Sequence, residues 1–305
     1  MPHTIQSILT QDKPALEAAL ALDAGSARIE VQCLLQAVLQ VNRAYLLTHP
    51  EQQLDAEQQA RYTALLERRL RGEPIAYLLG EREFYGLTFR VTPATLIPRA
   101  DTELLVELAL QRIPQPLAPP GLPNPSQPPL VRGGVSEHAY RVLDLGTGSG
   151  AIALSIAHAR PDVEVTAVDA SQEALGVARE NAQRLNIGNA RLLRSDWFSA
   201  LAGERFDMIV SNPPYIAEGD AHLAQGDLRF EPCDALASGA DGLDDIRRIV
   251  ADAKEHLDAG GWLLFEHGYD QAERVRELLG AAGYTKVFSA RDLAGIERVS
   301  GGRAC

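Results

Sequence analysis

Near its middle the chain reads Val142-Leu143-Asp144-Leu145-Gly146-Thr147-Gly148-Ser149-Gly150. The first four residues are mostly apolar and indicate a short buried strand, and the segment 151–160 that follows has a helical pattern. Glycine is needed where the backbone turns sharply and approaches a ligand closely, and the start of a helix offers unpaired N–H groups. We therefore expect a ligand at this strand-to-helix turn; a purely structural glycine turn is the alternative.

The rest of the chain after Arg141 alternates between short apolar runs and helical patterns. Such alternation specifies a mostly parallel sheet that is covered by helices on both faces. The predicted fold class is therefore α/β, with a doubly wound sheet. Strands are expected at 142–145, 163–168, 191–194, 206–211 and 262–265, helices at 151–160, 172–186, 244–257 and 271–282, and a pair of edge strands at 284–289 and 297–300.

The first part of the chain is organised differently. Residues 4–71 carry apolar side chains at helical spacing with breaks at Gly or Pro, which predicts three to five helices. Residues 84–91 show the alternation of a β-hairpin, and Asp101 precedes the apolar helix 104–113 as its expected N-cap. Residues 114–135 hold eight of the eighteen prolines and are expected to form an exposed loop without regular structure.

These patterns divide the chain into four parts. We expect a small helical domain at 1–80, a hairpin and linking helix at 81–113, a Pro-rich flexible insertion at 114–139, and an α/β domain with the ligand-binding turn at 140–305.

The composition is that of a folded protein with an acidic surface. The hydrophobic fraction of 46% can fill a core, and the formal net charge is −12. Binding to the phosphates of nucleic acid requires Lys and Arg side chains, and a net negative charge opposes it. Direct binding to nucleic acid is therefore not expected. Cys33, Cys233 and Cys305 share no metal-ligand spacing, so we expect reduced thiols, no metal and a cytoplasmic location. Neither a secretory signal nor a membrane-spanning run is visible, so no membrane association is expected.

Asp169 ends the second expected strand, 23 residues after Gly146. An acid at about this distance can accept hydrogen bonds from both hydroxyls of a ribose, and the alternative is a cap for the helix that begins near Ser171. Together with the glycine turn, Asp169 favours an adenosine-type ligand. The spacing Gly-x-Gly-x-Gly lacks the Gly-x-Gly-x-x-Gly of a nicotinamide dehydrogenase and resembles motif I of the class I S-adenosylmethionine-dependent methyltransferases.

Asn212-Pro213-Pro214-Tyr215 follows the fourth expected strand directly and is the most specific local signal in the chain. The consecutive prolines stiffen a corner on the same sheet edge as the glycine turn. An amide or exocyclic amine is a poor nucleophile because its lone pair is delocalised. The Asn212 side-chain oxygen and the Pro213 carbonyl can accept its two N–H hydrogens, and Tyr215 can stack on its flat face. The corner therefore favours methyl transfer to a planar nitrogen over a merely rigid turn.

Three further side chains are expected near this edge of the sheet. Asp196 and Trp197 follow the third strand, where an adenine ring would lie. Asp196 could accept a hydrogen bond from the adenine amino group, and Trp197 could stack against the ring or simply plug the sheet edge. His267 follows the fifth strand without an evident partner and is expected to be structural.

Over nearly its whole length the chain resembles the release-factor glutamine methyltransferases, the PrmC/HemK family. Asn-Pro-Pro-Tyr alone is shared with other nitrogen methyltransferases, including DNA adenine and ribosomal guanine enzymes. The family usually has Pro at the position of Ala100, and the stretch 114–139 is longer than its usual connection. The segments that carry the resemblance are Gly72–Leu78, Glu83–Leu87, Leu96–Arg99, Asp101–Glu103, Asp144–Gly150, Asn212–Tyr215, Arg229–Pro232 and Leu264–Gly268.

The resemblance implies a class I methyltransferase fold with a seven-stranded sheet and S-adenosylmethionine as cofactor. It implies N5-methylation of the glutamine in the Gly-Gly-Gln motif of class 1 peptide-chain release factors, which the helical domain would dock. The family's cofactor-binding residues fall on Gly146, Thr147, Gly148, Ser149, Gly150, Asp169, Trp197 and Asn212. Its substrate-binding residues fall on Asn212, Pro213, Pro214 and Tyr215, of which Asn212, Pro213 and Tyr215 are expected to be catalytic.

Two other functions stay open on the sequence. An N-methyltransferase for the amino groups of adenine or guanine in DNA or RNA could use the same corner, but it would be expected to carry a basic recognition domain. A non-catalytic S-adenosylmethionine-binding module would have no reason to keep stiff acceptors beside the methyl group.

Overall fold

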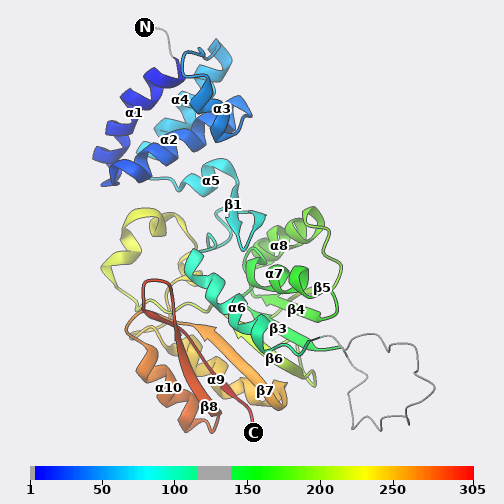
Figure 1. Cartoon of the computed structure of the whole chain (residues 1–305). Coiled ribbons are helices and arrows are strands. Elements are labelled where there is room, and N and C mark those ends of the chain that lie inside the picture. The colour runs from blue at the N-terminus through cyan, green and yellow to red at the C-terminus, as the bar shows by residue number, and fades with distance from the viewer. Residues whose placement is uncertain (1–3, 116–138) are drawn as a thin grey trace, which may run out of the picture.

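The computed structural model describes residues 4–115 and 139–305 (Figure 1). The expected Pro-rich flexible insertion, 114–139, falls almost entirely outside the described residues. None of the helices in the described ranges is both long and apolar enough to cross a membrane. The described chain begins with α1 (Ile5–Leu20), α2 (Ala24–Leu39), α3 (Arg43–Thr48), α4 (Ala56–Leu70) and α5 (Ile75–Leu79), in agreement with the expected helical region.

The first four helices begin at polar N-cap residues and share a core. The side chains of the caps Thr4, Asp23, Asn42 and Asp55 accept backbone N–H groups of the first turn, which explains where these helices start. The apolar stripes face inward, as the helical spacing predicts. Buried members of this core include Ile5, Leu16, Val31, Leu34, Leu35, Val38 and Tyr62.

A hairpin joins this helical region to the rest of the chain. β1 (Glu81–Phe84) pairs antiparallel with β2 (Leu87–Arg90), so the expected hairpin is confirmed. Its two turn residues, Tyr85 and Gly86, have φ of 52° and 75°. Positive φ at both positions is typical of a tight turn whose twist matches the strands.

The expected N-cap at Asp101 is wrong. Asp101 lies inside a 3₁₀ turn, η1 (Ala100–Thr102), and α6 (Glu103–Arg112) continues from that turn without a side-chain cap. Asp101 instead faces Arg298, with 3.8 Å between carboxylate and guanidinium. The 3₁₀ turn makes a side-chain cap unnecessary because the turn itself starts the helix.

In the described residues seven strands form the large sheet, in the order β5-β4-β3-β6-β7-β9-β8. The strands from β5 to β7 run parallel, and β9 is antiparallel to both β7 and β8. The predicted doubly wound, mostly parallel sheet is confirmed. Its strands are β3 (Arg141–Leu145), β4 (Glu164–Asp169), β5 (Ala190–Arg194), β6 (Phe206–Ser211), β7 (Leu257–Glu266), β8 (Thr285–Arg291) and β9 (Glu297–Arg303), and its helices are α7 (Ala151–Ala159), α8 (Gln172–Arg184), α9 (Asp244–His256) and α10 (Ala272–Ala281).

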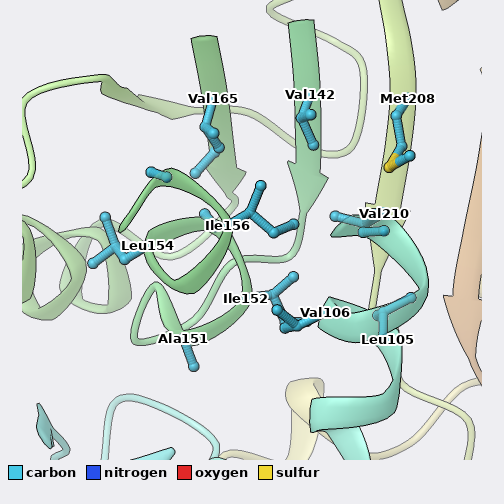
Figure 2. Close-up of a cluster of buried hydrophobic side chains, with 14 of the residues drawn as sticks. Leu105, Val106, Val142, Ala151, Ile152, Leu154, Ile156, Val165, Met208 and Val210 are labelled. Atoms are coloured by element: carbon cyan, nitrogen blue, oxygen red, sulfur yellow. The ribbon is translucent and has the colours of Figure 1, made fainter. Parts of the chain in front are cut away.

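Side chains along each strand alternate between the faces of the sheet, and each face has its own core. Val142 belongs to the core beneath α6 and α7, whereas its neighbour Leu143 belongs to the core beneath α9 and α10. Burial on both faces explains why the strands read as apolar runs instead of alternating with polar residues. Figure 2 shows part of the first core, in which Val142, Val165 and Met208 of the strands lie with Ile152 and Ile156 of α7 and with Leu105 and Val106 of α6.

The register of β3 and β6 brings two distant segments together. Leu145, the last residue of β3, pairs with Ser211, the last residue of β6. The Ser211 hydroxyl also donates to the Leu145 carbonyl at 2.8 Å. Gly146 and Asn212 therefore leave adjacent parallel strands at the same edge. The strand order reverses here, which is where α/β sheets usually bind ligands.

Asn181 of α8 ties the hairpin to the glycine turn. Its side chain accepts from the Arg90 N–H at 2.7 Å and donates to the Arg90 carbonyl at 3.0 Å and the Ser149 carbonyl at 2.9 Å. Asn181 is fully buried. Its removal would take a partner from the Ser149 carbonyl, in a buried bond, and from the Arg90 N–H and carbonyl, in part-buried bonds.

We expect Asn181→Ala to lower the free energy of unfolding by about 3 kcal/mol, because backbone groups in one buried and two part-buried hydrogen bonds lose their partner. Chemical denaturation measures this change. The control is Gln183→Ala at an exposed position of the same helix, which should stay within about 0.5 kcal/mol of the unsubstituted protein. Equal stability of the two variants would show that the Asn181 bonds contribute nothing.

Candidate active site

A cavity of about 630 Å³ lies at the carboxyl ends of the central strands. Its volume is within the usual range for sites of small ligands and cofactors. The walls come from segments that are far apart in the sequence but meet at this edge of the sheet. Of the expected cofactor-binding residues, Gly146, Thr147, Gly148, Ser149, Asp169, Trp197 and Asn212 line the cavity.

The three glycines of the turn differ in what surrounds them. All have positive φ: 69° at Gly146, 56° at Gly148 and 85° at Gly150. A Cβ at Gly150 would lie 2.9 Å from Leu154 Cδ1, so this glycine allows close packing of the helix and does not line the cavity. A Cβ at Gly148 would meet nothing within 4 Å. Gly148 therefore leaves space open at the cavity wall, as a closely approaching ligand requires.

Asp169 connects the glycine turn to the next strand. Its Oδ2 accepts from the Gly148 N–H and its Oδ1 from the Ser171 N–H, both at 2.8 Å. The helix-cap alternative is wrong, since Ser171 caps α8 by accepting from the Ala174 N–H. Burial raises the pKa of the Asp169 carboxyl, and the two backbone bonds lower it. A carboxylate has about four acceptor sites, so Asp169 retains capacity for a ligand.

Asp144 supports the same turn from inside the protein. Its Oδ2 accepts from the Thr147 hydroxyl at 2.6 Å and from the Ala153 N–H at 3.2 Å. Complete burial raises the pKa of Asp144 to about 7, against the lowering effect of these hydrogen bonds. Asp144 lines neither cavity, so its position indicates a supporting role for the turn.

The expected adenine-side residues both line the large cavity. Trp197 lies against the glycine turn, with its ring 3.6 Å from the point where a Gly146 Cβ would be. Asp196 is engaged by Arg248 of α9, whose guanidinium donates to the two carboxylate oxygens at 2.9 and 3.1 Å. The sequence pattern missed Arg248, because α9 follows Trp197 by more than forty residues.

The Asn-Pro-Pro-Tyr corner separates the large cavity from a smaller one of about 160 Å³. Pro214 lines the large cavity, whereas Pro213 and Tyr215 line the small one. Asn212 lines both. The geometry thus places one amide side chain where a ligand in the large cavity and a group in the small cavity would meet.

The two ends of the Asn212 amide have different surroundings. Nδ2 donates to the Thr102 hydroxyl oxygen at 3.2 Å. Oδ1 is buried and has no hydrogen-bond partner among the described residues. A buried acceptor without a partner costs about 1–3 kcal/mol, which a donor from a ligand would recover. Asn212, which lines both cavities, therefore carries a buried acceptor that has no partner among the described residues.

Tyr215 is held at both its backbone and its hydroxyl. The backbone N–H donates to the Leu236 carbonyl at 3.2 Å, and the hydroxyl donates to Glu266 Oε1 at 3.1 Å. Burial and the nearby Glu266 carboxylate raise the pKa of the Tyr215 phenol far above its usual value, so the hydroxyl stays protonated and donates. The ring is half-buried and lines the small cavity, while stacking on a substrate remains a prediction.

Arg99 lines both cavities and is held in place by a carboxylate that the motif analysis did not assign. It forms an ion pair with Glu231, which is fully buried at its side chain and also accepts from the Ile97 N–H at 2.9 Å. Both residues lie in segments that carry the family resemblance. Their partnership could not be read from the sequence, since 132 residues separate them.

A buried arginine connects this region to the helices. Arg69 of α4 is only 4% exposed and donates to Glu30 at 2.7 and 2.9 Å. It also donates to Asp227 at 3.1 Å, in the 3₁₀ turn η3 (Gly226–Phe230) that precedes Glu231. The helical region is therefore tied by a charged hydrogen bond to the loop that borders the small cavity.

His267 is structural, as expected. It is fully buried and lines neither cavity. Its Nδ1 contacts the Gly268 carbonyl at 2.9 Å, so Nδ1 carries the proton and Nε2 accepts from the Ser300 hydroxyl at 2.8 Å. Burial lowers the pKa of the imidazole, in keeping with a neutral ring that joins β7 to β9.

The fold and the site define a class I methyltransferase. The Methyltransferase small domain family matches residues 130–228, and the PrmC N-terminal domain family matches residues 15–80. Among solved structures, the hMettl16 catalytic domain in complex with the MAT2A 3′UTR hairpin 6 is similar, with a TM-score of 0.51 over 78% of this chain and 81% of that chain. At 16% sequence identity this likeness concerns the fold alone.

Within that class the chain belongs to the family of release factor glutamine methyltransferases, and the resemblance stated from its motifs is confirmed. It is 51% identical to the release factor glutamine methyltransferase of Bordetella pertussis over 93% of this chain and 97% of that one. It is 49% identical to the Escherichia coli protein of the same name, over 91% and 92% of the two chains. The Pseudomonas aeruginosa relative is 50% identical over 93% and 95%.

Proposed function

We propose that this protein transfers the methyl group of S-adenosylmethionine to the side-chain amide N5 of the glutamine in the Gly-Gly-Gln motif of class 1 peptide-chain release factors. Its family membership supports the reaction. The observation that carries the proposal for the site is the buried Oδ1 of Asn212, which has no partner among the described residues and belongs to a residue that lines both cavities.

The large cavity suits S-adenosylmethionine. Gly146–Gly150 would hold its amino-acid end, Asp169 its ribose hydroxyls and Trp197 its adenine. The open space at Gly148 and the remaining acceptor capacity of Asp169 support this fit. Asn212 would border both cofactor and substrate. When bound, the cofactor supplies an electrophilic methyl group on a sulfonium.

The small cavity suits the end of a glutamine side chain. An amide nitrogen has a delocalised lone pair, and the protein must both orient it and stabilise the positive charge that develops. Asn212 Oδ1 and the Pro213 carbonyl would accept its two hydrogens, and the Tyr215 ring would lie against the amide plane. Orientation and charge stabilisation of this kind can lower a barrier by several kcal/mol, with roughly 7–11 kcal/mol as the limit for ideal orientation.

A release factor as substrate agrees with the rest of the chain. The net charge of −12 disfavours direct contact with nucleic acid, so we propose a protein substrate in the cytoplasm. The helical region would dock that protein, and the Arg69–Asp227 bond would transmit its position to the loop beside the small cavity. Methylation of adenine or guanine amino groups is the alternative for the same corner, and a non-catalytic cofactor-binding module is the other.

We expect the purified protein to transfer labelled methyl from S-adenosylmethionine to a class 1 release factor. A release factor whose motif Gln is replaced by Ala should remain unlabelled, because the accepting nitrogen is gone. Scintillation counting with DNA and RNA as parallel substrates separates the alternatives. Labelling of nucleic acid alone, or equal labelling of both release factors, contradicts the proposal, and cofactor binding without transfer would indicate a binding module.

Asp169→Ala is expected to weaken S-adenosylmethionine binding by about 10- to 100-fold, since hydrogen bonds to a charged group contribute about 1.5–3 kcal/mol. Isothermal titration calorimetry measures the dissociation constant. Asp252→Ala, at an exposed position of α9 outside both cavities, is the control and should bind normally. An unchanged dissociation constant for Asp169→Ala would exclude the ribose role.

A further inference from the structure

The Asn-Pro-Pro-Tyr corner is supported by a buried carboxylate that the proposed chemistry does not itself use. Glu266, the last residue of β7, is 2% exposed and accepts from the Tyr215 hydroxyl at 3.1 Å. Burial raises the pKa of this carboxyl, and the hydroxyls of Thr102 and Tyr215 lower it. Its other oxygen, Oε2, is buried and has no hydrogen-bond partner among the described residues. Glu266 is therefore an acceptor with capacity to spare.

Thr102 lies between this carboxylate and the Asn212 amide. It is 4% exposed and accepts from Asn212 Nδ2 at 3.2 Å, and its hydroxyl is one of the groups that lower the pKa of the Glu266 carboxyl. A threonine hydroxyl has one proton and two lone pairs. If the proton is directed to the carboxylate, only a lone pair is left for the amide. The amide must then present its NH₂ group to Thr102 and its oxygen elsewhere.

The orientation of the Asn212 amide decides whether the corner can work. When Nδ2 donates to Thr102, Oδ1 is the amide atom that has no partner among the described residues. A rotation of 180° would exchange the two ends and offer N–H donors to an amide nitrogen that itself donates. The backbone at Asn212 is also restricted, because this residue directly follows β6 and precedes two prolines.

Resting on the proposed function, we infer that Glu266 and Thr102 are positioning residues that hold the Asn212 amide with its oxygen available to the substrate nitrogen. Glu266 does this through the Thr102 hydroxyl, and it holds the other end of the corner directly through the Tyr215 hydroxyl. The structure shows the first bond of this chain, from Asn212 Nδ2 to the Thr102 hydroxyl oxygen, and the inference adds donation from the Thr102 hydroxyl to the Glu266 carboxylate. Neither residue needs to touch the reacting atoms.

The test is the turnover of Thr102→Val, which keeps the shape of the side chain and removes the hydroxyl. We expect kcat for release-factor methylation to fall about 10- to 100-fold, as misplacement of a catalytic group does, while the cofactor dissociation constant changes less than about twofold. Thr102→Ser keeps the hydroxyl and should recover kcat to within about threefold. Thr166→Val, a buried threonine of β4 outside both cavities, is the matched control and should keep full turnover.

A double variant tests whether Thr102 and Glu266 act through one chain of hydrogen bonds or affect kcat separately. Glu266→Gln removes an acceptor without changing the volume and should also lower kcat. When Thr102→Val is added to Glu266→Gln, kcat should fall by less than about a further threefold. The reason is that both substitutions break the same chain of hydrogen bonds. Fully additive losses, a failure of serine to recover kcat, or wild-type turnover in Thr102→Val would each overturn the inference. A loss of cofactor affinity that matches the loss of kcat would also overturn it, because it would indicate general damage.

A measurement without turnover separates this inference from the proposed function. In protein with ¹⁵N-labelled asparagine, the side-chain amide hydrogens of Asn212 should exchange with water at least about tenfold faster in Thr102→Val than in Thr102→Ser or the unsubstituted protein. Equal exchange in all three would overturn the inference. Slow exchange that depends on the Thr102 hydroxyl, in a protein that fails to methylate release factors, would uphold the inference and reject the proposed function.

Discussion

The site depends on the parallel pairing of β3 with β6. Leu145 opposite Ser211 makes two chain segments leave the sheet side by side, one as a glycine turn and the other as a proline-stiffened corner. The pairing is strongly determined, because a shift by one residue would move Leu143 and Ile209 out of the core beneath α9 and α10. The cores on both faces thus fix the glycine turn and the corner that begins at Asn212 relative to one another.

Polar side chains that are buried around this edge give the two segments their shape. Asp144 and Asp169 accept hydrogen bonds from the glycine turn, and Asn181 holds the turn against the hairpin. Thr102 and Glu266 lie beneath the corner in the same way. Because unpaired polar groups are costly away from water, such bonds leave few alternative arrangements. They leave Oδ1 of Asn212 as a buried side-chain acceptor on the corner that has no partner among the described residues.

Much of this architecture was predictable from local patterns. The strand at 206–211 was predicted to the residue, because an apolar run ends there at a proline corner. The strand expected at 262–265 begins earlier, at Leu257, since β7 continues irregularly through Gly260 and Gly261, which resemble a turn in sequence. The Asp101 cap was wrong because a 3₁₀ turn has no distinct sequence signal here.

The place of the expected site residues at one edge of the sheet was predictable, because glycines and prolines mark sharp turns after strands. Their supporting partners were not, because hydrogen bonds across the fold have no local pattern. Thr102 is 110 residues from Asn212, and Glu266 is 51 residues from Tyr215. Both lie in segments that resemble the family, so the sequence marked the segments without indicating what the side chains contact.

The most direct measurement of the role of Asn212 is a crystal structure of the protein with S-adenosylhomocysteine and a class 1 release factor. We expect the side-chain nitrogen of the motif glutamine in the small cavity, within about 3.2 Å of Asn212 Oδ1. A glutamine nitrogen held by other acceptors, with Asn212 Oδ1 turned away from it, would contradict the proposed role of the corner.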